Sequence, residues 1–233
     1  KNNAPLSGNP VRGADELATL IYTSGTTGLP KGVMHSFGNF AWALDSGIRR
    51  LPMGADDRML SYLPLAHVVE RVLVEHGWLR TGMQVYFADS LDTFAADLQR
   101  ARPTIFFSVP RLWVKFQQGV HHKMPPAKLN RMLSIPILGG IVRRKVQKAL
   151  GLDHCRIAAG GAAPMPMALL QWYSKLGLHI NEGYGMTENL AVSHITEPGK
   201  NQQGTVGPAY DGVEDRIDPQ TGEIQMRSPA LML

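Results

Sequence analysis

The chain has 233 residues, of which 44% are hydrophobic and 18% are charged, with a mean hydropathy of −0.12 and a formal net charge of +5. This composition is typical of a globular protein with a sizeable buried core, and it excludes a disordered or low-complexity chain. Its single cysteine, Cys155, excludes an internal disulfide and a cysteine-based zinc site, so we expect a protein of the reducing cytoplasm.

Strands and helices are predicted to alternate along residues 1–203, in the opening order strand, loop, strand, helix. The expected strands are 17–22, 59–63, 83–87, 104–109, 155–159 and 178–182. One helix is expected where Phe37, Phe40, Leu44 and Ile48 recur at helical spacing. The other expected helices are 68–79, 91–100 and 165–176. This alternation favours an α/β fold in which helices cover a parallel sheet.

The pattern changes in the last part of the chain. Residues 213–217 and 223–227 flank the turn sequence Asp218-Pro219-Gln220-Thr221-Gly222, which predicts a β-hairpin. We therefore expect two parts, an α/β core over 1–203 and the start of an antiparallel β subdomain over 204–233.

Basic residues are concentrated in one stretch. Residues 98–152 contain eleven Arg or Lys and no Asp or Glu, which leaves 13 basic against 19 acidic residues elsewhere. The segment 110–150 within it is helix-prone and interrupted by prolines. Such a surface suits an anionic partner. No nucleic-acid-binding motif accompanies it, so nucleic acid is not expected, whereas an anionic membrane surface and a plain solvated helix face both stay open.

A loop rich in glycine and threonine follows the first expected strand. It reads Tyr22-Thr23-Ser24-Gly25-Thr26-Thr27-Gly28-Leu29-Pro30-Lys31-Gly32. Its glycines allow backbone N–H groups to point inward, four hydroxyls add donors, and Lys31 adds a positive charge. The pattern differs from a Walker A loop, because Pro30 and Gly32 flank the lysine. The expected phosphate-binding residues are Thr23, Ser24, Gly25, Thr26, Thr27, Gly28 and Lys31.

This loop resembles the phosphate-loop signature of the AMP-forming acyl-CoA synthetases and adenylating enzymes, and further segments agree with that family in order. The segment 62–67 (Tyr-Leu-Pro-Leu-Ala-His) resembles the one beside the acyl pocket, 160–166 (Gly-Gly-Ala-Ala-Pro-Met-Pro) the adenine-side loop, and 182–188 (Glu-Gly-Tyr-Gly-Met-Thr-Glu) the nucleotide-contact motif. Residues 222–229 resemble Gly-Glu-Ile-x-x-Arg-Gly-Pro, with Ser228 in place of the second Gly. The resemblance implies the parallel-sheet-rich nucleotide-binding core of the large N-terminal domain of adenylating enzymes, ending in an antiparallel β segment.

The residues of these segments suit nucleotide chemistry. In the last one, glycines allow close approach to a flat ligand, Tyr184 offers a stacking face and Glu188 is a hard oxygen ligand. By resemblance, the nucleotide-binding residues are Gly161, Ala162, Ala163, Gly183, Tyr184, Gly185, Met186 and Thr187. The resemblance also implies that Thr23 and Glu188 bind Mg²⁺, that Lys31, Thr187 and Glu188 are catalytic, and that His67 and Val68 line an acyl pocket.

The activity implied is that of a long-chain fatty acid–CoA ligase, which uses ATP, Mg²⁺ and coenzyme A. Segments 102–113 and 170–173 resemble the long-chain branch. Two alternatives stay open. An amino-acid adenylation domain that loads a carrier protein would need a pocket aspartate, for which Asp89 is a weak candidate. A nucleotide-binding remnant without activity is the other. No Ser/His/Asp triad or His-based zinc motif is evident, as the isolated His67 and the pair His121 and His122 lack further ligands.

The ends of the chain indicate a middle fragment. It opens Lys-Asn-Asn and closes Leu-Met-Leu, without a signal sequence or a terminal motif. By resemblance, the small C-terminal domain of the family would lie beyond Leu233. No apolar stretch reaches the ~18–20 residues of a spanning helix. We therefore expect a cytoplasmic location, with peripheral contact at the inner membrane face as the alternative.

Overall fold

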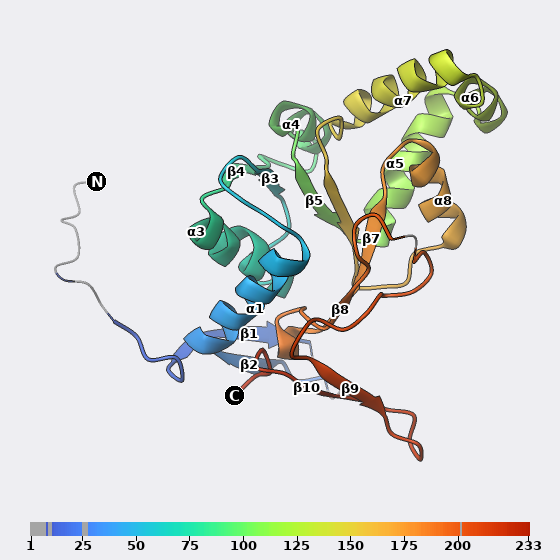
Figure 1. Cartoon of the computed structure of the whole chain (residues 1–233). Coiled ribbons are helices and arrows are strands. Elements are labelled where there is room, and N and C mark those ends of the chain that lie inside the picture. The colour runs from blue at the N-terminus through green and yellow to red at the C-terminus, as the bar shows by residue number, and fades with distance from the viewer. Residues whose placement is uncertain (1–7, 9–10, 25–27, 201) are drawn as a thin grey trace.

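The first described elements form a hairpin that leads into a helix. A computed structural model describes residues 8, 11–24, 28–200 and 202–233 (Figure 1). Strands β1 (Leu17–Thr23) and β2 (Lys31–Ser36) are antiparallel, and α1 (Phe37–Arg50) follows directly. The start of α1 is fixed by a capping box, in which Ser36 Oγ accepts from the Asn39 N–H over 3.1 Å and Asn39 Oδ1 accepts from the Ser36 N–H over 2.9 Å. The predicted order of strand, loop, strand and helix is confirmed.

Parallel strands form the centre of the molecule. Strand β3 (Arg58–Ser61) pairs with β4 (Gln84–Phe87), and β5 (Ile105–Ser108), β6 (Ile157–Gly160) and β7 (Ile180–Tyr184) pair in that order, all parallel. A short β8 (His194–Ile195) is antiparallel to β7. The Thr104 N–H donates to the Arg58 carbonyl over 2.9 Å and links the two groups of strands. The predicted α/β class with a parallel sheet is confirmed.

Helices lie on both sides of these strands, with α1 and α3 on one side and α5 and α8 on the other (Figure 1). Within the described residues, none is long and apolar enough to cross a bilayer. The remaining helical elements are α2 (Val68–Glu70), η1 (Arg71–His76), α3 (Gly77–Thr81), α4 (Phe94–Ala101), α5 (Pro110–Lys123), α6 (Pro126–Leu133), α7 (Pro136–Leu150), α8 (Met167–Lys175) and η2 (Thr187–Asn189).

The expected single helix over 68–79 differs in its middle turn. It is helical from α2 through α3, but η1 is a π-helical turn. The His76 ring stacks on Phe40 of α1 with centroids 3.9 Å apart, and His76 Nδ1 lies 2.9 Å from the Arg71 carbonyl oxygen. These contacts join the wider turn to α1. The periodicity of residues 68–79 cannot predict them, because Phe40 lies in another segment of the chain.

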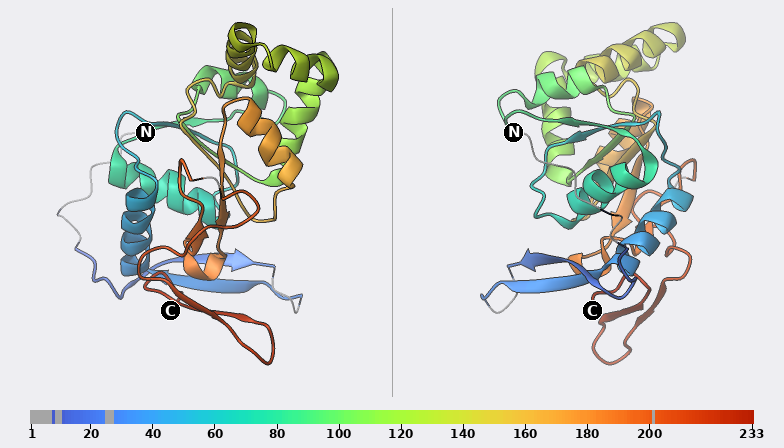
Figure 2. Two further views of the ribbon diagram at one scale, coloured as in Figure 1. Left: turned by 45° about the vertical axis from the view of Figure 1, so that its right-hand side comes forward. Right: turned by 90° about the vertical axis from the view of Figure 1, so that its left-hand side faces the viewer.

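The larger hydrophobic core packs α5 to α8 against β5 to β7. Trp113, Tyr173 and Phe106 are buried there, and the Tyr173 hydroxyl donates to the Trp113 carbonyl over 2.6 Å. The basic segment therefore has a packed inner face. Figures 1 and 2 show α6 and α7 at one end of the molecule, far from the β1–β2 hairpin.

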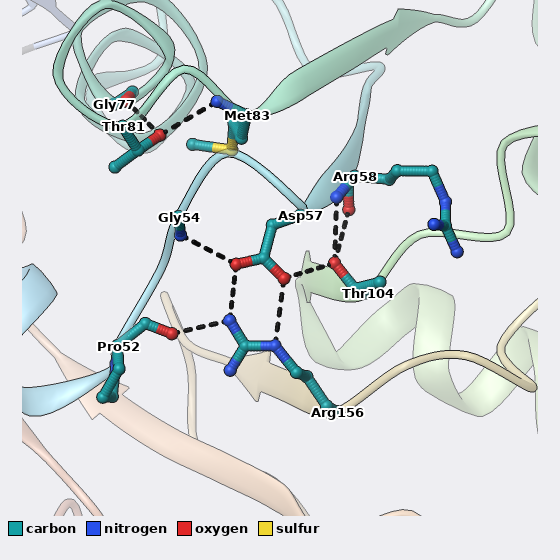
Figure 3. A network of polar contacts seen from close by, with 9 residues as sticks. All are labelled: Pro52, Gly54, Asp57, Arg58, Gly77, Thr81, Met83, Thr104 and Arg156. Atoms are coloured by element: carbon teal, nitrogen blue, oxygen red, sulfur yellow. Dashed lines mark hydrogen bonds and ion pairs between the residues drawn. The ribbon is translucent and has the colours of Figure 1, made fainter.

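A polar network ties three strands together at their amino ends (Figure 3). The buried carboxylate of Asp57 accepts from Arg156 Nε over 2.9 Å, from Arg156 Nη2 over 2.5 Å and from Thr104 Oγ1 over 2.6 Å. The Gly54 N–H donates to Asp57 over 2.9 Å. Asp57 precedes β3, Thr104 precedes β5 and Arg156 precedes β6, so the network fixes one edge of the sheet.

The last strands form the predicted hairpin. Strand β9 (Glu214–Ile217) is antiparallel to β10 (Ile224–Arg227), with Ile217 opposite Ile224. In the turn, Asp218 Oδ1 accepts from the N–H groups of Gln220 and Thr221 over 2.8 and 3.0 Å. The antiparallel ending is confirmed, while the division of the chain at residue 203 stays a prediction.

Candidate functional site

The loops with the candidate residues meet at one edge of the sheet. Ser108 of β5, Gly160 of β6 and Glu182 of β7 are register partners near the carboxyl ends of their strands. In open α/β sheets, ligands bind outside these carboxyl ends. The chain continues from β6 into Gly161 and from β7 into Gly185, so both loops lie at this edge.

A cavity of about 380 Å³ runs along one face of β5 and β6, from Ile105 and Ile157 at their amino ends to Gly161 at this edge, and brings together residues from distant segments. Its lining includes ten of the residues predicted from the sequence: His67, Val68, Gly161, Ala162, Gly183, Tyr184, Gly185, Met186, Thr187 and Glu188. The predicted nucleotide-binding and acyl-binding residues therefore share one cavity. Ala163 is exposed and lies outside the lining, as does Asp89.

The loop after β6 passes very close to β7. A Cβ atom on Gly161 would lie 3.0 Å from the Gly183 carbonyl oxygen, so a larger residue would separate the two loops. The next residue, Ala162, has a φ of 68°, a left-handed conformation that costs an L-residue roughly 1–2 kcal/mol. Backbone strain of this kind is often found where a ligand is held.

The loop after β7 is tightly wound. A Cβ atom on Gly185 would lie 2.5–2.6 Å from the backbone of Ala191, so only glycine fits. The Met186 N–H donates to Asn189 Oδ1 over 2.9 Å, and the Ala191 N–H donates to the Met186 carbonyl over 2.9 Å. These contacts hold Thr187 and Glu188 in η2, on the wall of the cavity.

The hairpin and the C-terminal residues hold η2 from outside. His35 of β2 is fully buried, and its Nε2 lies 2.7 Å from the Thr187 carbonyl oxygen. Burial lowers the pKa of His35, although the hydrogen bond to Thr187 opposes this shift. His35 is therefore neutral near pH 7, and Nε2 carries the proton that it donates to Thr187. The Met232 N–H donates to the Glu188 carbonyl over 2.8 Å.

Another part of the cavity lining is apolar. His67 caps α2, because its Nδ1 accepts from the Val69 N–H over 3.3 Å. Burial lowers the pKa of His67, which favours the neutral ring. Val68, Val69 and Val72 follow on the helix, are all buried and line the cavity. The predicted position of His67 at the start of a helix is confirmed.

The predicted phosphate loop is described only in part. Gly25, Thr26 and Thr27 lie outside the described residues. Thr23 pairs with Lys31 at the end of the β1–β2 hairpin, and Lys31 is exposed. Ser24 and Gly28 are exposed beside the undescribed part of the loop. None of these four residues lines the cavity.

Thr23 and Glu188, the predicted Mg²⁺ ligands, lie on different elements, at the end of β1 and in η2. Thr23 lies four residues along β1 from Thr19, the partner of His35, which is about 13 Å of strand. No hydrogen bond joins Thr23 to Glu188 within the described chain, which also contains no cluster of three His, Cys, Asp or Glu able to hold a metal. A hydroxyl and a carboxylate still fit Mg²⁺, which binds proteins through few carboxylates and takes its other ligands from phosphates and water.

Several residues of the cavity were not predicted as site residues. They come from α1 and β5 and from the chain after η2: Ala43, Leu44, Gly47, Phe107, Val192 and Tyr210. Leu44 belongs to the predicted apolar face of its helix, and Phe107 to a predicted strand. The sequence alone does not indicate which apolar side chains of an element face a cavity and which face the core.

An α/β sheet with glycine-containing loops beside a cavity that reaches the carboxyl ends of its strands is typical of nucleotide-binding proteins. Residues 2–233 match the family model described as AMP-binding enzyme. The chain belongs to this family. Over 75% of this chain, it is 34% identical to the long-chain-fatty-acid–CoA ligase ACSBG2 of Rattus norvegicus. Over 88% of this chain, it is 32% identical to long-chain-fatty-acid–CoA ligase 6 of Mus musculus. It spans only 31% and 32% of these two proteins.

Solved structures agree with this assignment. A malonyl-CoA ligase, in a ternary product complex with methylmalonyl-CoA and AMP, is 28% identical with a TM-score of 0.70, over 96% of this chain and 46% of that one. The N-terminal domain of FACL13 from Mycobacterium tuberculosis matches 98% of this chain and 54% of that one with a TM-score of 0.72 at 22% identity. The predicted fold of an adenylating N-terminal domain is therefore confirmed.

Proposed function

We propose that the protein is an ATP-dependent, AMP-forming fatty acid–CoA ligase that prefers long-chain acids. The observation that carries the proposal is the shared cavity, whose lining combines the loop residues Tyr184 and Thr187 with apolar residues such as Val68. A fatty acyl-adenylate has the same two halves, a nucleotide and a hydrocarbon chain. The relatives named as long-chain-fatty-acid–CoA ligases support this substrate class.

The proposed reaction has two steps. A carboxylate oxygen of the fatty acid attacks the α-phosphorus of ATP, a new P–O bond forms, and pyrophosphate leaves with the electron pair of the broken bond. The thiol of coenzyme A then attacks the acyl carbon, a C–S bond forms, and AMP leaves as the thiol proton is released to water. Neither step needs a nucleophile from the protein.

The residues of this chain bind and orient the nucleotide. In the proposal, Tyr184 stacks on adenine, while Gly183 and Thr187 contact the nucleotide through the backbone and a hydroxyl. Lys31 and the phosphate loop stabilise charge on the phosphates, which is the largest contribution protein groups make to phosphoryl chemistry. Thr23 and Glu188 would hold Mg²⁺, which when bound neutralises phosphate charge.

The residues of the apolar wall bind the acyl chain. Val68, Val69 and Val72 would remove its methylenes from water, which contributes ~0.8 kcal/mol for each buried methylene. His67 directly precedes Val68 in the lining. Its neutral ring can donate or accept a hydrogen bond near the substrate carboxylate without carrying a charge itself. A cytoplasmic location is part of the proposal, because the single cysteine, Cys155, cannot form an internal disulfide.

ATP–pyrophosphate exchange with a panel of acids tests the proposal in the complete protein. We expect palmitate to support exchange at least about tenfold better than acetate or any amino acid, because each added methylene increases binding until the cavity is filled. Preference for an amino acid would instead indicate a domain that loads a carrier protein. ATP binding without exchange for any acid would indicate a remnant without activity.

A further inference from the structure

Glu70 is a buried acid that the proposed reaction leaves without a role. It is the last residue of α2 and is 1% exposed. Its Oε1 accepts hydrogen bonds from Ser61 Oγ over 2.5 Å and from the Tyr62 N–H over 3.1 Å. A buried carboxyl is costly unless such bonds satisfy it, and the groups that satisfy it are fixed in return. The contacts of Glu70 therefore show which part of the fold it holds.

The hydrogen bonds of Glu70 close a loop of the chain. Strand β3 ends at Ser61, the chain turns at Pro64, and α2 returns to Ser61 through the Glu70 carboxyl. We call this segment the 61–70 loop. Inside it, the His67 N–H donates to the Pro64 carbonyl over 2.8 Å, and the Glu70 N–H donates to the His67 carbonyl over 3.1 Å. His67 is thus held between the turn and the bonded carboxyl.

The 61–70 loop is also joined to β5. The Tyr62 hydroxyl lies 3.1 Å from the Phe107 carbonyl oxygen and 3.0 Å from Ser108 Oγ. Phe107 lines the cavity, as do His67 and Val68. The hydrogen bonds that start at Glu70 therefore connect two parts of the lining, on α2 and on β5. Within the described chain, they do not involve the loops after β6 and β7, where the predicted nucleotide-binding residues lie.

We propose that Glu70 is a positioning residue for the carboxylic acid substrate, and that it acts through His67. Without the carboxyl, the Ser61 hydroxyl and the Tyr62 N–H would be buried donors that lack an acceptor, so the 61–70 loop would shift to satisfy them. Such a shift displaces His67 and leaves the nucleotide loops in place. A displacement of about 1 Å can lower a rate on the order of 10²-fold. The identity of the substrate rests on the proposed function.

Two substitutions of Glu70 separate this role from packing. Leucine fills a similar volume without an acceptor, whereas the amide of glutamine keeps one acceptor oxygen. The variants are Glu70→Leu and Glu70→Gln. The matched controls are Glu75→Leu and Glu75→Gln, because Glu75 lies on the next helical turn, in η1, and is 40% exposed beside Arg71. Only the Glu70 variants change a group that holds the 61–70 loop.

NMR of isotope-labelled histidine in the complete protein tests the position of His67 independently of activity. The His67 signal is assigned with His67→Asn, which keeps a capping oxygen for the Val69 N–H. We expect this signal to move or split in Glu70→Leu and to return in Glu70→Gln, with no change in the controls. If Glu70→Leu does not fold, Ser61→Ala removes one of the two bonds and should move the same signal. An unchanged signal in the folded variant would overturn the proposal.

Pyrophosphate exchange tests the consequence for the substrate. Glu70→Leu should raise the KM for palmitate about tenfold or more and leave the KM for ATP within about twofold, while Glu70→Gln stays near the unmodified values. Because Glu70 acts through His67, adding Glu70→Leu to His67→Asn should raise the KM for palmitate little further. Effects that multiply, or equal rises in both KM values, would overturn the positioning role. No exchange with any acid would instead refute the proposed function, and the His67 signal would still test the contact.

Discussion

His35 and Thr187 are joined by a hydrogen bond of 2.7 Å although 152 residues separate them in the sequence. The buried, neutral imidazole of His35 donates from Nε2 to the Thr187 carbonyl, and its ring packs edge-on against Phe40. The β1–β2 hairpin, which carries the predicted phosphate loop, is thereby linked to the loop that carries Glu188. His35 is a positioning residue for the proposed reaction, because it supports the cavity wall from behind.

His35→Ala should weaken this link. The loss of one net hydrogen bond corresponds to about 1 kcal/mol, and the empty space left beside Phe40 adds to it. We expect a lower melting temperature and a KM for ATP raised about fivefold or more, with a smaller change in kcat. His179→Ala is the control, since His179 is exposed. An unchanged KM in a folded variant would show that the hairpin does not position the loop.

Gly185→Ala tests the close approach to Ala191. The new Cβ would lie 2.5–2.6 Å from backbone atoms that no side-chain rotation can move, so the loop must shift. We expect ATP affinity to fall at least about tenfold, measured by calorimetry. Gly119→Ala is the control, because it lies inside α5 with open space around it and should stabilise the protein by roughly 0.5–1 kcal/mol. Normal ATP binding by Gly185→Ala would contradict the geometry of this loop.

Lys31→Ala and Glu188→Ala test the phosphate and Mg²⁺ roles. Each should lower pyrophosphate exchange by about 10²-fold or more, as the loss of a preorganised charge contact does. Melting temperatures should change little, because Lys31 is exposed and Glu188 is partly exposed. The controls, Lys115→Ala and Glu223→Ala, remove exposed charges outside the cavity. Exchange at the unmodified rate in both variants would refute these roles.

Asp57→Asn tests the network at the other edge of the sheet. Burial alone would raise the pKa of Asp57, but hydrogen bonds from Arg156, Thr104 and Gly54 outweigh it and hold this pKa below its usual value. The carboxylate therefore stabilises the fold above about pH 4, and this contribution is lost as the pH falls through the folded pKa. In urea unfolding at pH 7, Asp57→Asn should lower the free energy of unfolding by about 2–3 kcal/mol.

The unfolding free energy of Asp57→Asn should also depend less on pH below about pH 4 than that of the unmodified protein. Asp45→Asn is the control, because Asp45 and its partner Arg80 are both substantially exposed, and such pairs contribute at most about 1 kcal/mol. A loss for Asp57→Asn no larger than that of the control would mean that the network does not fix the sheet.

Glu70→Gln should stabilise the protein at alkaline pH. Burial raises the pKa of Glu70, although hydrogen bonds from Ser61 and the Tyr62 N–H oppose this. Because the folded pKa lies above the unfolded one, stability falls as the pH rises from about 4.5 through the folded value. The amide keeps an acceptor oxygen and removes this loss. We expect the melting temperature of the variant minus that of the unmodified protein to be larger at pH 8 than at pH 5. The same difference at both pH values would contradict the raised pKa of Glu70.

Local patterns predicted most of the secondary structure. The turn sequence at 218–222 specifies a hairpin through Asp218 and Gly222, and short apolar runs indicate where strands form, because neighbouring residues largely decide these local features. Element ends differ by a few residues, as for the helix expected at 91–100 and observed as α4. Resemblance in the segments 62–67 and 182–188 also named most of the polar residues that line the cavity.

The sequence by itself determined the α/β class, the closing hairpin, the family and the glycine-rich segments of the candidate site. Only the tertiary structure decided that His35 supports Thr187, that the helix after His67 widens into a π turn against Phe40, and that Tyr62 bonds to Phe107 of β5. Each of these features depends on a partner distant in the chain. Periodicity shows that a residue is apolar and on which face of its element it lies, but which faces become buried is decided when the elements pack together.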